Sequence, residues 1–290
     1  MTDILDRYRT PGVFTGLGGF EAEIDALSAD VATLVAFVQG LLIHEGLVGA
    51  YGVALGPDRA AEKQIHGAAA MLRQALRLDD RPLAEARAPD RRVVGVCRHF
   101  ATLLAGVLRR KGYAARVRCG FANYFQPGKH VDHWVGEYWH ESQGRWVLVD
   151  PQVDAVQHKL FGLTLDTLDV PRDRFRVAGD AWRACRQGAD PMTFGVSGTP
   201  MWGLVEVYGD VFQDLAALQN LEFLPWGWYG LALDEAGMKE TALIDKLADI
   251  SSRADEAAMT DLAELLAADE RLRPPAERIA ATVESERAPI

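Results

Sequence analysis

The stretch that most strongly limits what this chain can fold into is residues 93–113. Three valines lead up to Cys97, apolar side chains then recur at helical spacing, and Gly112 is a typical helix stop. Cys97 is therefore predicted to lie at the N-terminus of a helix that has a buried face. Unpaired N–H groups and the positive end of the helix dipole favour a thiolate there, so we expect a lowered pKa for Cys97. This placement suits a nucleophile.

A second informative stretch, residues 130–152, is typical of a β-hairpin. Residues 133–139 and 145–149 are rich in Trp, Tyr and Val, and the turn between them contains Gly144, which is suited to positive φ. Folding this hairpin about its turn places Asp150 within about two residues of the position opposite His133. The hairpin therefore supplies an imidazole and a carboxylate that orients it, which is what a cysteine nucleophile needs.

Together these stretches resemble a known family. Gly-Val-Cys opens the predicted helix, a strand ends in Arg-Cys-Gly-Phe, and His-Trp-Val and Trp-Val-Leu-Val-Asp-Pro follow. In order, spacing and flanking residues, residues 93–154 are similar to the transglutaminase-like (papain-like) superfamily, with a general likeness to bacterial members. The resemblance implies an α+β fold in which the nucleophile-bearing helix packs on an antiparallel sheet. The spacing of apolar residues on either side of this core predicts N-terminal helices and a helical C-terminal extension.

The resemblance also implies a chemistry. It makes Cys97 the nucleophile, His133 the base and Asp150 the residue that orients His133. The expected reaction is acyl transfer or hydrolysis at an amide or thioester, on a small-molecule or peptide substrate, through a thioacyl-enzyme and without a cofactor. The N–H of Cys97 is the natural first oxyanion donor. No glutamine stands shortly before Cys97 to act as the second donor, as papain-type enzymes would have.

Two other functions stay open at this point. Arylamine N-acetyltransferases share the order Cys, His, Asp and a comparable length. They are expected to carry Arg-Gly-Gly and an aromatic residue around the cysteine, whereas this chain has VVGVCRH. A non-catalytic binding protein that has kept the fold is the second alternative, and the intact Cys97, His133 and Asp150 argue against it.

Several neighbouring residues compete for roles in the site. His130 precedes His133 by three residues and is a rival base, although a regular strand would place the two on opposite faces. His130, Asp132 and His133 also raise the question of a metal. We predict none, because no fourth well-spaced Cys or His ligand accompanies them.

Substrate contacts are assigned to residues beside the proposed triad. These are Tyr124 in the loop before the histidine strand, Trp134 and Gln152. His44, near the end of a predicted helix, is expected to complement the helix dipole or to pack rather than to bind a ligand.

Composition narrows the setting of the protein. The chain has 290 residues and a formal charge of −10, which argues against a nucleic-acid surface. Three cysteines do not make a disulfide framework. The first ten residues contain no apolar signal core, and no apolar run is long enough to span a membrane. We therefore expect a cytoplasmic protein with no membrane or nucleic-acid partner; its oligomeric state is left open.

By composition, the whole chain divides into four parts. Residues 1–92 are an N-terminal helical part with helices over 20–45 and 58–78, and residues 93–158 are the catalytic core. Residues 159–235 form a Trp-rich extension, and residues 236–290 are acidic helices, over 239–250 and 254–269, followed by a loosely held tail.

Four further expectations concern individual segments. The loop 79–92 is either one wall of the cleft or a plain connector, and the basic residues 109–118 form a solvated cluster. Cys119 and Cys185 are expected to be structural. The aromatic segment 224–230 is expected to tie the extension to the core rather than act as a lid.

Overall fold

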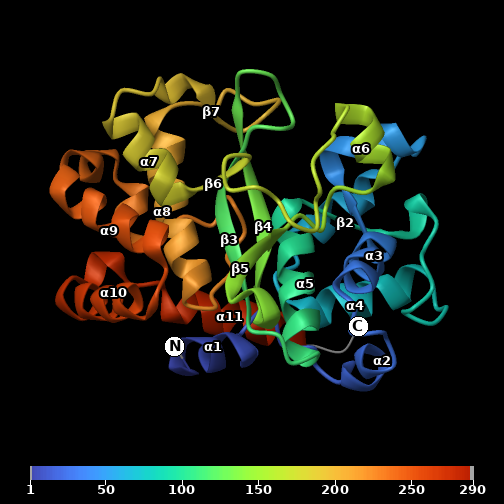
Figure 1. Ribbon diagram of the computed structural model, residues 1–290. Helices are drawn as coiled ribbons and strands as arrows, with labels where there is room; N and C mark the ends of the chain where they lie inside the picture. The colour runs from blue at the N-terminus through green and yellow to red at the C-terminus, as the bar shows by residue number, and fades with distance from the viewer. Residues whose placement is uncertain (1, 288–290) are drawn as a thin grey trace.

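A central antiparallel sheet separates two groups of helices in the computed structural model, which describes residues 2–287 (Figure 1). The sheet order is β5 (Arg145–Val149), β4 (His130–His140), β3 (Ala115–Ala122) and β6 (Phe175–Val177), and β7 (Phe194–Gly195) runs parallel to the start of β4. A separate parallel pair joins β1 (Leu42–His44) to β2 (Val93–Gly95). The α+β architecture expected from the sequence is confirmed.

The helices fall into an N-terminal and a C-terminal group, and α5 lies between the N-terminal helices α3 and α4 and the sheet. Their bounds are α1 (Thr2–Arg9), α2 (Glu21–Asp25), α3 (Val31–Leu41), α4 (Ala68–Leu78), α5 (Cys97–Arg110), α6 (Ala155–Phe161), α7 (Ala178–Arg186), α8 (Leu204–Leu218), α9 (Thr241–Arg253), α10 (Glu256–Ala268) and α11 (Ala276–Arg287).

One face of the sheet is covered by α5, as the helical spacing of its apolar residues predicts. Leu104 of α5 packs against Gly136 of β4, where the lack of a side chain lets the helix come close. The helices α3 and α4 then pack on the outer side of α5 and share its apolar core. Nearly every residue of α5 is therefore buried.

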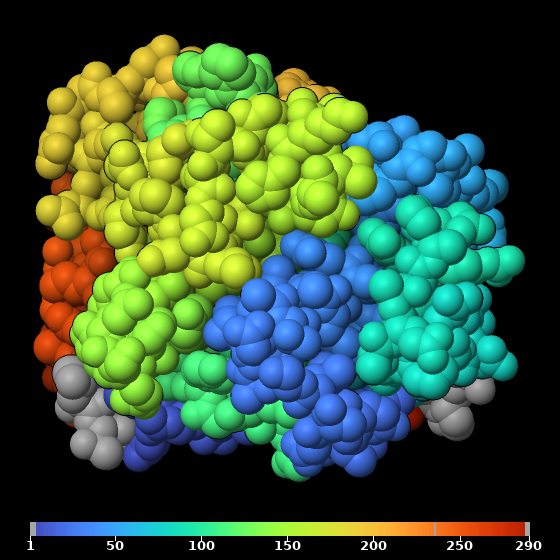
Figure 2. All heavy atoms as spheres, turned by 45° about the vertical axis from the view of Figure 1, so that its right-hand side comes forward, coloured from blue at the N-terminus to red at the C-terminus, as the bar shows by residue number. Residues whose placement is uncertain are grey.

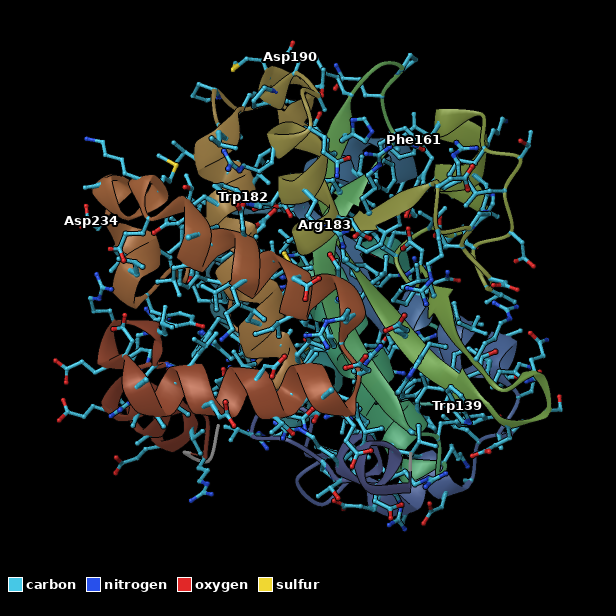
Figure 3. The ribbon with its side chains drawn as sticks, turned by 60° about the vertical axis from the view of Figure 1, so that its left-hand side comes forward. Trp139, Phe161, Trp182, Arg183, Asp190 and Asp234 are labelled. Atoms are coloured by element: carbon cyan, nitrogen blue, oxygen red, sulfur yellow. The ribbon has the colours of Figure 1, made fainter. Side chains whose placement is uncertain are left out.

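The C-terminal helices cover the other side of the molecule, where α8 contacts β3. Asp214 of α8 accepts a 2.9 Å hydrogen bond from the backbone N–H of Cys119 and pairs with the Arg118 guanidinium at 2.8 Å. Trp182, on α7, is buried and donates from Nε1 to Asp245 of α9 at 2.7 Å (Figure 3). The extension is therefore integral to the fold, and α8 supplies hydrogen bonds that β3 would otherwise lack.

The predicted N-terminal helices are each interrupted. The segment 20–45 contains α2, α3 and β1, because Asp30 caps a new helix by accepting from the Thr33 N–H at 3.0 Å. The segment 58–78 begins as a 3₁₀ helix (Pro57–Gln64), and α4 starts only after Gly67. The loop 79–92 is anchored by the buried Arg87, whose guanidinium binds five of the loop's carbonyls.

The expected solvated basic cluster is partly wrong: Arg110 is exposed and Lys111 is half-buried, but Arg109, Arg116 and Arg118 are buried. Their charges are matched from distant parts of the chain. Glu137 of β4 lies 2.6 Å from Arg116 and 3.3 Å from Arg118, and it also pairs with Arg172. Burial opposes ionisation of Glu137, but the three guanidinium groups outweigh it and hold the pKa of this carboxyl well below its usual range.

The C-terminal expectations are partly wrong. The two acidic helices are present as α9 and α10, but the predicted loose tail is instead α11. Glu286 of α11 accepts hydrogen bonds from the backbone N–H groups of His66 and Gly67, at 2.5 and 2.9 Å. In the segment 224–230, Tyr229 is buried and donates to the Phe212 carbonyl at 3.2 Å, which supports the structural role.

Within residues 2–287, no helix combines the length and the apolar character that crossing a membrane would require.

Candidate active site

Cys97 is the first residue of α5, directly after the short strand β2. The His99 ring caps the start of this helix, because its Nδ1 accepts from the backbone N–H of Val96 at 3.1 Å. The thiol lies near the sheet, in a cluster with Cys119 and Trp134, and only 6% of Cys97 is exposed. The predicted mounting of this cysteine at a helix N-terminus is confirmed.

The hydrogen bonds of β3 and β4 show at which edge of β4 the Cys97 thiol lies. Cys119 and Trp134 are direct partners across β3 and β4, and the Cys119 N–H points away from β4 to Asp214. Cys119 and Trp134 are therefore a non-hydrogen-bonded pair, in which each backbone N–H points away from the partner strand. The Trp134 N–H accordingly points away from β3, toward the edge of β4 where β5 pairs. The paired part of β5 ends at Val149, opposite Gly136, so this N–H is free to hydrogen-bond the sulfur of Cys97.

The expected lowering of the Cys97 pKa is wrong. Burial raises the pKa of this thiol well above its usual value, and the carboxylates of Asp132 and Asp150 raise it further. Hydrogen bonds from the N–H groups of Trp134 and Arg98 act in the opposite direction without reversing the shift. Desolvation thus affects the pKa of Cys97 more than the helix N-terminus does, and the resting group is a neutral thiol.

His133 and Asp150 meet on one face of the hairpin. Extending the β4–β5 register by one residue sets Asp150 opposite Val135, two residues from His133 and on the same face. Nε2 of His133 lies 2.9 Å from Oδ2 of Asp150, and both side chains are buried. The predicted proximity of these residues is therefore observed, and Gly144 in the turn has the expected positive φ of 60°.

Asp150 is held as an ionised acceptor. Burial alone would raise its pKa, but the charge and hydrogen bond of His133 outweigh burial. The Tyr124 hydroxyl at 2.7 Å and the Gln152 N–H at 3.0 Å donate to the same carboxylate, and the pKa of Asp150 falls below its usual value. Because Asp150 accepts from Nε2, Nδ1 is the nitrogen of His133 that remains for a reacting partner.

The region that carries these residues matches a family model. Residues 63–151 match the transglutaminase-like superfamily. These residues form a transglutaminase-like core. No curated protein and no solved structure matched the chain in the corresponding searches. Cys97, His133 and Asp150 all lie within the transglutaminase-like core, in the order that the sequence analysis assigned to nucleophile, base and orienting residue.

His44 lies beside the core's candidate residues, although it precedes the matched region. It is in β1, opposite Gly95 of β2, two residues before Cys97. Burial, together with the nearby His133, lowers the pKa of His44 to about 4, so its imidazole is neutral at pH 7. Its Nδ1 accepts from the Gly46 N–H at 3.2 Å, which leaves the proton on Nε2. The helix end predicted at His44 gave no sign of this proximity to Cys97.

The residues nominated for substrate contact are all buried. Tyr124 binds Asp150, and Gln152 donates from Nε2 to Gln157 at 3.0 Å as well as from its backbone to Asp150. Trp134 lies in the cluster with Cys97, on the face opposite His133. Their role in substrate binding stays a prediction.

The structure also shows where His130 and the residues considered as metal ligands lie. The His130 ring stacks on Phe194 with centroids 4.4 Å apart, and the Nε2 of His133 is engaged by Asp150. The three-residue set considered from the sequence is therefore not assembled. A different group of possible metal ligands does come together: ligand atoms of Cys119, Asp132 and Asp210 all lie within 4.8 Å of one another.

Aromatic side chains close over His133. The Phe125 ring lies 4.8 Å from the His133 ring and 5.1 Å from Phe161 of α6, which Figure 3 labels. A separate surface depression of about 810 Å³ lies between α3 and the segment 153–168, lined by Gln39, Asp154 and His158 among others (Figure 2). None of its lining residues belongs to the Cys97, His133 and Asp150 set.

Proposed function

We propose that this protein is a cysteine enzyme that transfers or hydrolyses acyl groups of amides or thioesters, with Cys97, His133 and Asp150 as its triad. The observation that carries the proposal is the 2.9 Å contact between His133 Nε2 and Asp150, next to a cysteine that binds the backbone of the residue following His133. Members of the transglutaminase-like superfamily are usually cysteine enzymes, and some are non-catalytic. An orienting carboxylate suits an imidazole that must accept and return a proton.

The first half-reaction begins with Cys97 as a protonated thiol. As substrate binds, Nδ1 of His133 takes the proton of Cys97, and the sulfur attacks the carbonyl carbon to form a tetrahedral oxyanion. The bond to the leaving amine or thiol then breaks, and His133 returns the proton to it. This leaves a thioester on Cys97. Asp150 stays ionised throughout and stabilises the imidazolium that forms.

Two donors are proposed for the oxyanion. The backbone N–H of Cys97 is the first, because it is an unpaired group at the start of α5. We assign the second to Nε2 of His44, which carries the proton and makes no hydrogen bond among the described residues. A neutral imidazole is a suitable donor, since it stabilises the developing charge without giving up its proton.

The second half-reaction transfers the acyl group to water or an amine. His133 takes a proton from the acceptor, which attacks the thioester carbon, and the Cys97 thiol is restored when the C–S bond breaks. We propose a small-molecule or peptide substrate for this site. A cytoplasmic, reducing setting is also proposed, and it is supported by three unpaired cysteines.

The test is to trap the acyl-enzyme. The full chain is incubated with a set of acyl thioesters and glutamine peptides, and its intact mass and peptide map are recorded. We expect one acyl group on Cys97, none in Cys97→Ala, and an unchanged adduct in Cys185→Ser, which alters a half-buried thiol remote from the site. Binding of these compounds without an adduct would favour the non-catalytic alternative. An adduct that persists in Cys97→Ala would refute the assignment of the nucleophile.

A further inference from the structure

The inner side of α8 carries a row of buried carboxyl groups. Glu206, Asp210 and Asp214 are spaced four residues apart, so they lie on one face of the helix, and all three are buried. Asp214 is matched by Arg118 and by the Cys119 N–H. Neither Glu206 nor Asp210 has a basic partner among the described residues, and Oδ2 of Asp210, a residue only 3% exposed, has no hydrogen-bond partner.

The sheet brings two more donors to this helix face. Phe121 pairs with Asp132 and Cys119 pairs with Trp134, so Asp132 and Cys119 project from the same face of the sheet. Asp214 fixes α8 against Cys119, and Asp210 lies one helical turn earlier. As a result, ligand atoms of Cys119, Asp132 and Asp210 converge within 4.8 Å, and Oδ1 of Asp132 is also buried without a partner.

We propose that Cys119, Asp132 and Asp210 bind a zinc ion. Burial of neighbouring carboxyl groups without a cation favours their neutral forms, and a divalent ion at this point would supply the positive charge that their ionised forms need. A thiolate donor disfavours Mg²⁺ and Ca²⁺, whereas Zn²⁺ accepts both thiolate and carboxylate ligands. Tetrahedral zinc ligands lie about 3.5 Å apart, so small side-chain rotations complete the site. Glu206, one helical turn before Asp210, adds a third carboxyl group near the site.

The consequence for the fold is specific. The ion would join α8 to β3 and β4 through Cys119, which belongs to the same buried cluster as Cys97. Binding would release the thiol proton of Cys119 to solvent and form a Zn–S bond. The site uses no atom of Cys97, His133 or Asp150, so no residue of the proposed triad serves as a ligand.

Cobalt provides a readout that does not depend on activity. The full-length protein is stripped with a chelator under reducing conditions and titrated with Co²⁺, and the near-ultraviolet thiolate-to-cobalt charge-transfer band is followed. We expect a band that saturates at one equivalent and disappears when Zn²⁺ is added. Zinc should also raise the Tm, because it binds the folded state.

Three variants identify the ligands. Cys119→Ser should remove the band, and Asp210→Asn should weaken Co²⁺ binding by more than about tenfold, since even groups behind metal ligands contribute 10- to 100-fold. Cys97→Ser should keep the band. Circular dichroism of each metal-free variant verifies that it is folded. If Asp210→Asn does not fold, Asp132→Asn replaces it and should weaken Co²⁺ binding in the same way. Absence of a band in the wild type, or a band lost in Cys97→Ser and kept in Cys119→Ser, would overturn the proposal.

Discussion

The Tyr124 hydroxyl and the His133 imidazole bind the same oxygen, Oδ2 of Asp150, at 2.7 and 2.9 Å. The two side chains reach this oxygen from different parts of the chain, Tyr124 from the loop after β3 and His133 from β4. A carboxylate that accepts from both has little freedom to rotate. Tyr124 therefore acts on His133 through Asp150, as a positioning residue.

The first prediction concerns Tyr124→Phe. Loss of a hydrogen bond to a buried charged group should lower the free energy of unfolding by about 1.5–3 kcal/mol and loosen the orientation of His133. Urea unfolding measures the first effect, and the rate of acyl-enzyme formation should fall along with it. Tyr113→Phe is the matched control, because the Tyr113 hydroxyl binds an exposed carbonyl at 2.9 Å. Equal losses in both variants would contradict a special role for Tyr124.

The second prediction follows from the raised pKa of Cys97. A thiol whose pKa lies above its ordinary value of about 8.5 is protonated at neutral pH, so iodoacetamide should label Cys97 slowly at pH 7. The rate should climb through the alkaline range when measured by peptide mapping in the presence of a chelator. A rate that is already at its plateau below pH 7 would show a resting thiolate–imidazolium pair instead.

A third prediction separates oxyanion stabilisation from thiol reactivity at His44. Alkylation of Cys97 by iodoacetamide forms no oxyanion, whereas acylation by a thioester does. Loss of one oxyanion donor costs about 10²- to 10³-fold in rate, so His44→Ala should slow acylation by that factor and leave alkylation unchanged. His44→Gln keeps an N–H donor and should recover part of the loss. If alkylation and acylation slow equally, His44 supports the fold near Cys97 rather than the oxyanion.

The fourth prediction distinguishes the two histidines of β4. His133→Ala removes the base and should reduce acyl-enzyme formation by several orders of magnitude. His130→Ala removes a ring that stacks on Phe194 and should affect stability more than acylation. Stopped-flow acylation and thermal unfolding are measured on both variants. Normal acylation in His133→Ala would exclude this residue as the base.

The fifth prediction concerns Glu137 and its three arginine partners. Removing one partner of a buried ion pair costs about 3–5 kcal/mol, so Glu137→Gln should be strongly destabilised at pH 7. Because the folded-state pKa of Glu137 is depressed, its stabilisation is present above the unfolded value of about 4.3 and is lost as pH falls below it. The difference in free energy of unfolding between wild type and Glu137→Gln should therefore be smaller at pH 3 than at pH 7, by up to about 2 kcal/mol.

Urea midpoints at pH 7 and pH 3 measure this loss. Glu141→Gln serves as the control, since Glu141 is exposed and its ion pair with Arg9 should contribute less than about 1 kcal/mol. An advantage of wild type over Glu137→Gln that is the same at both pH values would contradict the depressed pKa.

Local patterns predicted much of the catalytic region. The start of α5 at Cys97, the hairpin turn at Gly144 and the proximity of His133 to Asp150 all depend on residues close in sequence. Long-range contacts could not be predicted in this way. The arginines of β3 looked solvated because Glu137 and Asp214, their partners, lie 19 to 96 residues away.

The same limit explains the errors in the site. The pKa of Cys97 depends on how much water the surrounding chain excludes, which a helix N-terminus alone does not specify. His44 and the carboxyl row of α8 reach the core from positions 53 residues before and more than 100 residues after Cys97. Their side chains come close to Cys97 and Cys119 only when the folded chain packs these distant segments together.

The bond between Glu286 and the start of α4 has a consequence for how the protein is made. The N–H groups of His66 and Gly67 receive their acceptor from a residue synthesised about 220 positions later, and the carbonyl of His66 also binds Arg98, the neighbour of Cys97. During translation the nascent chain thus exposes an uncapped helix beside the nucleophile for tens of seconds, at 5–20 residues per second. Until residue 286 has left the ribosome, this corner remains open to chaperones and proteases.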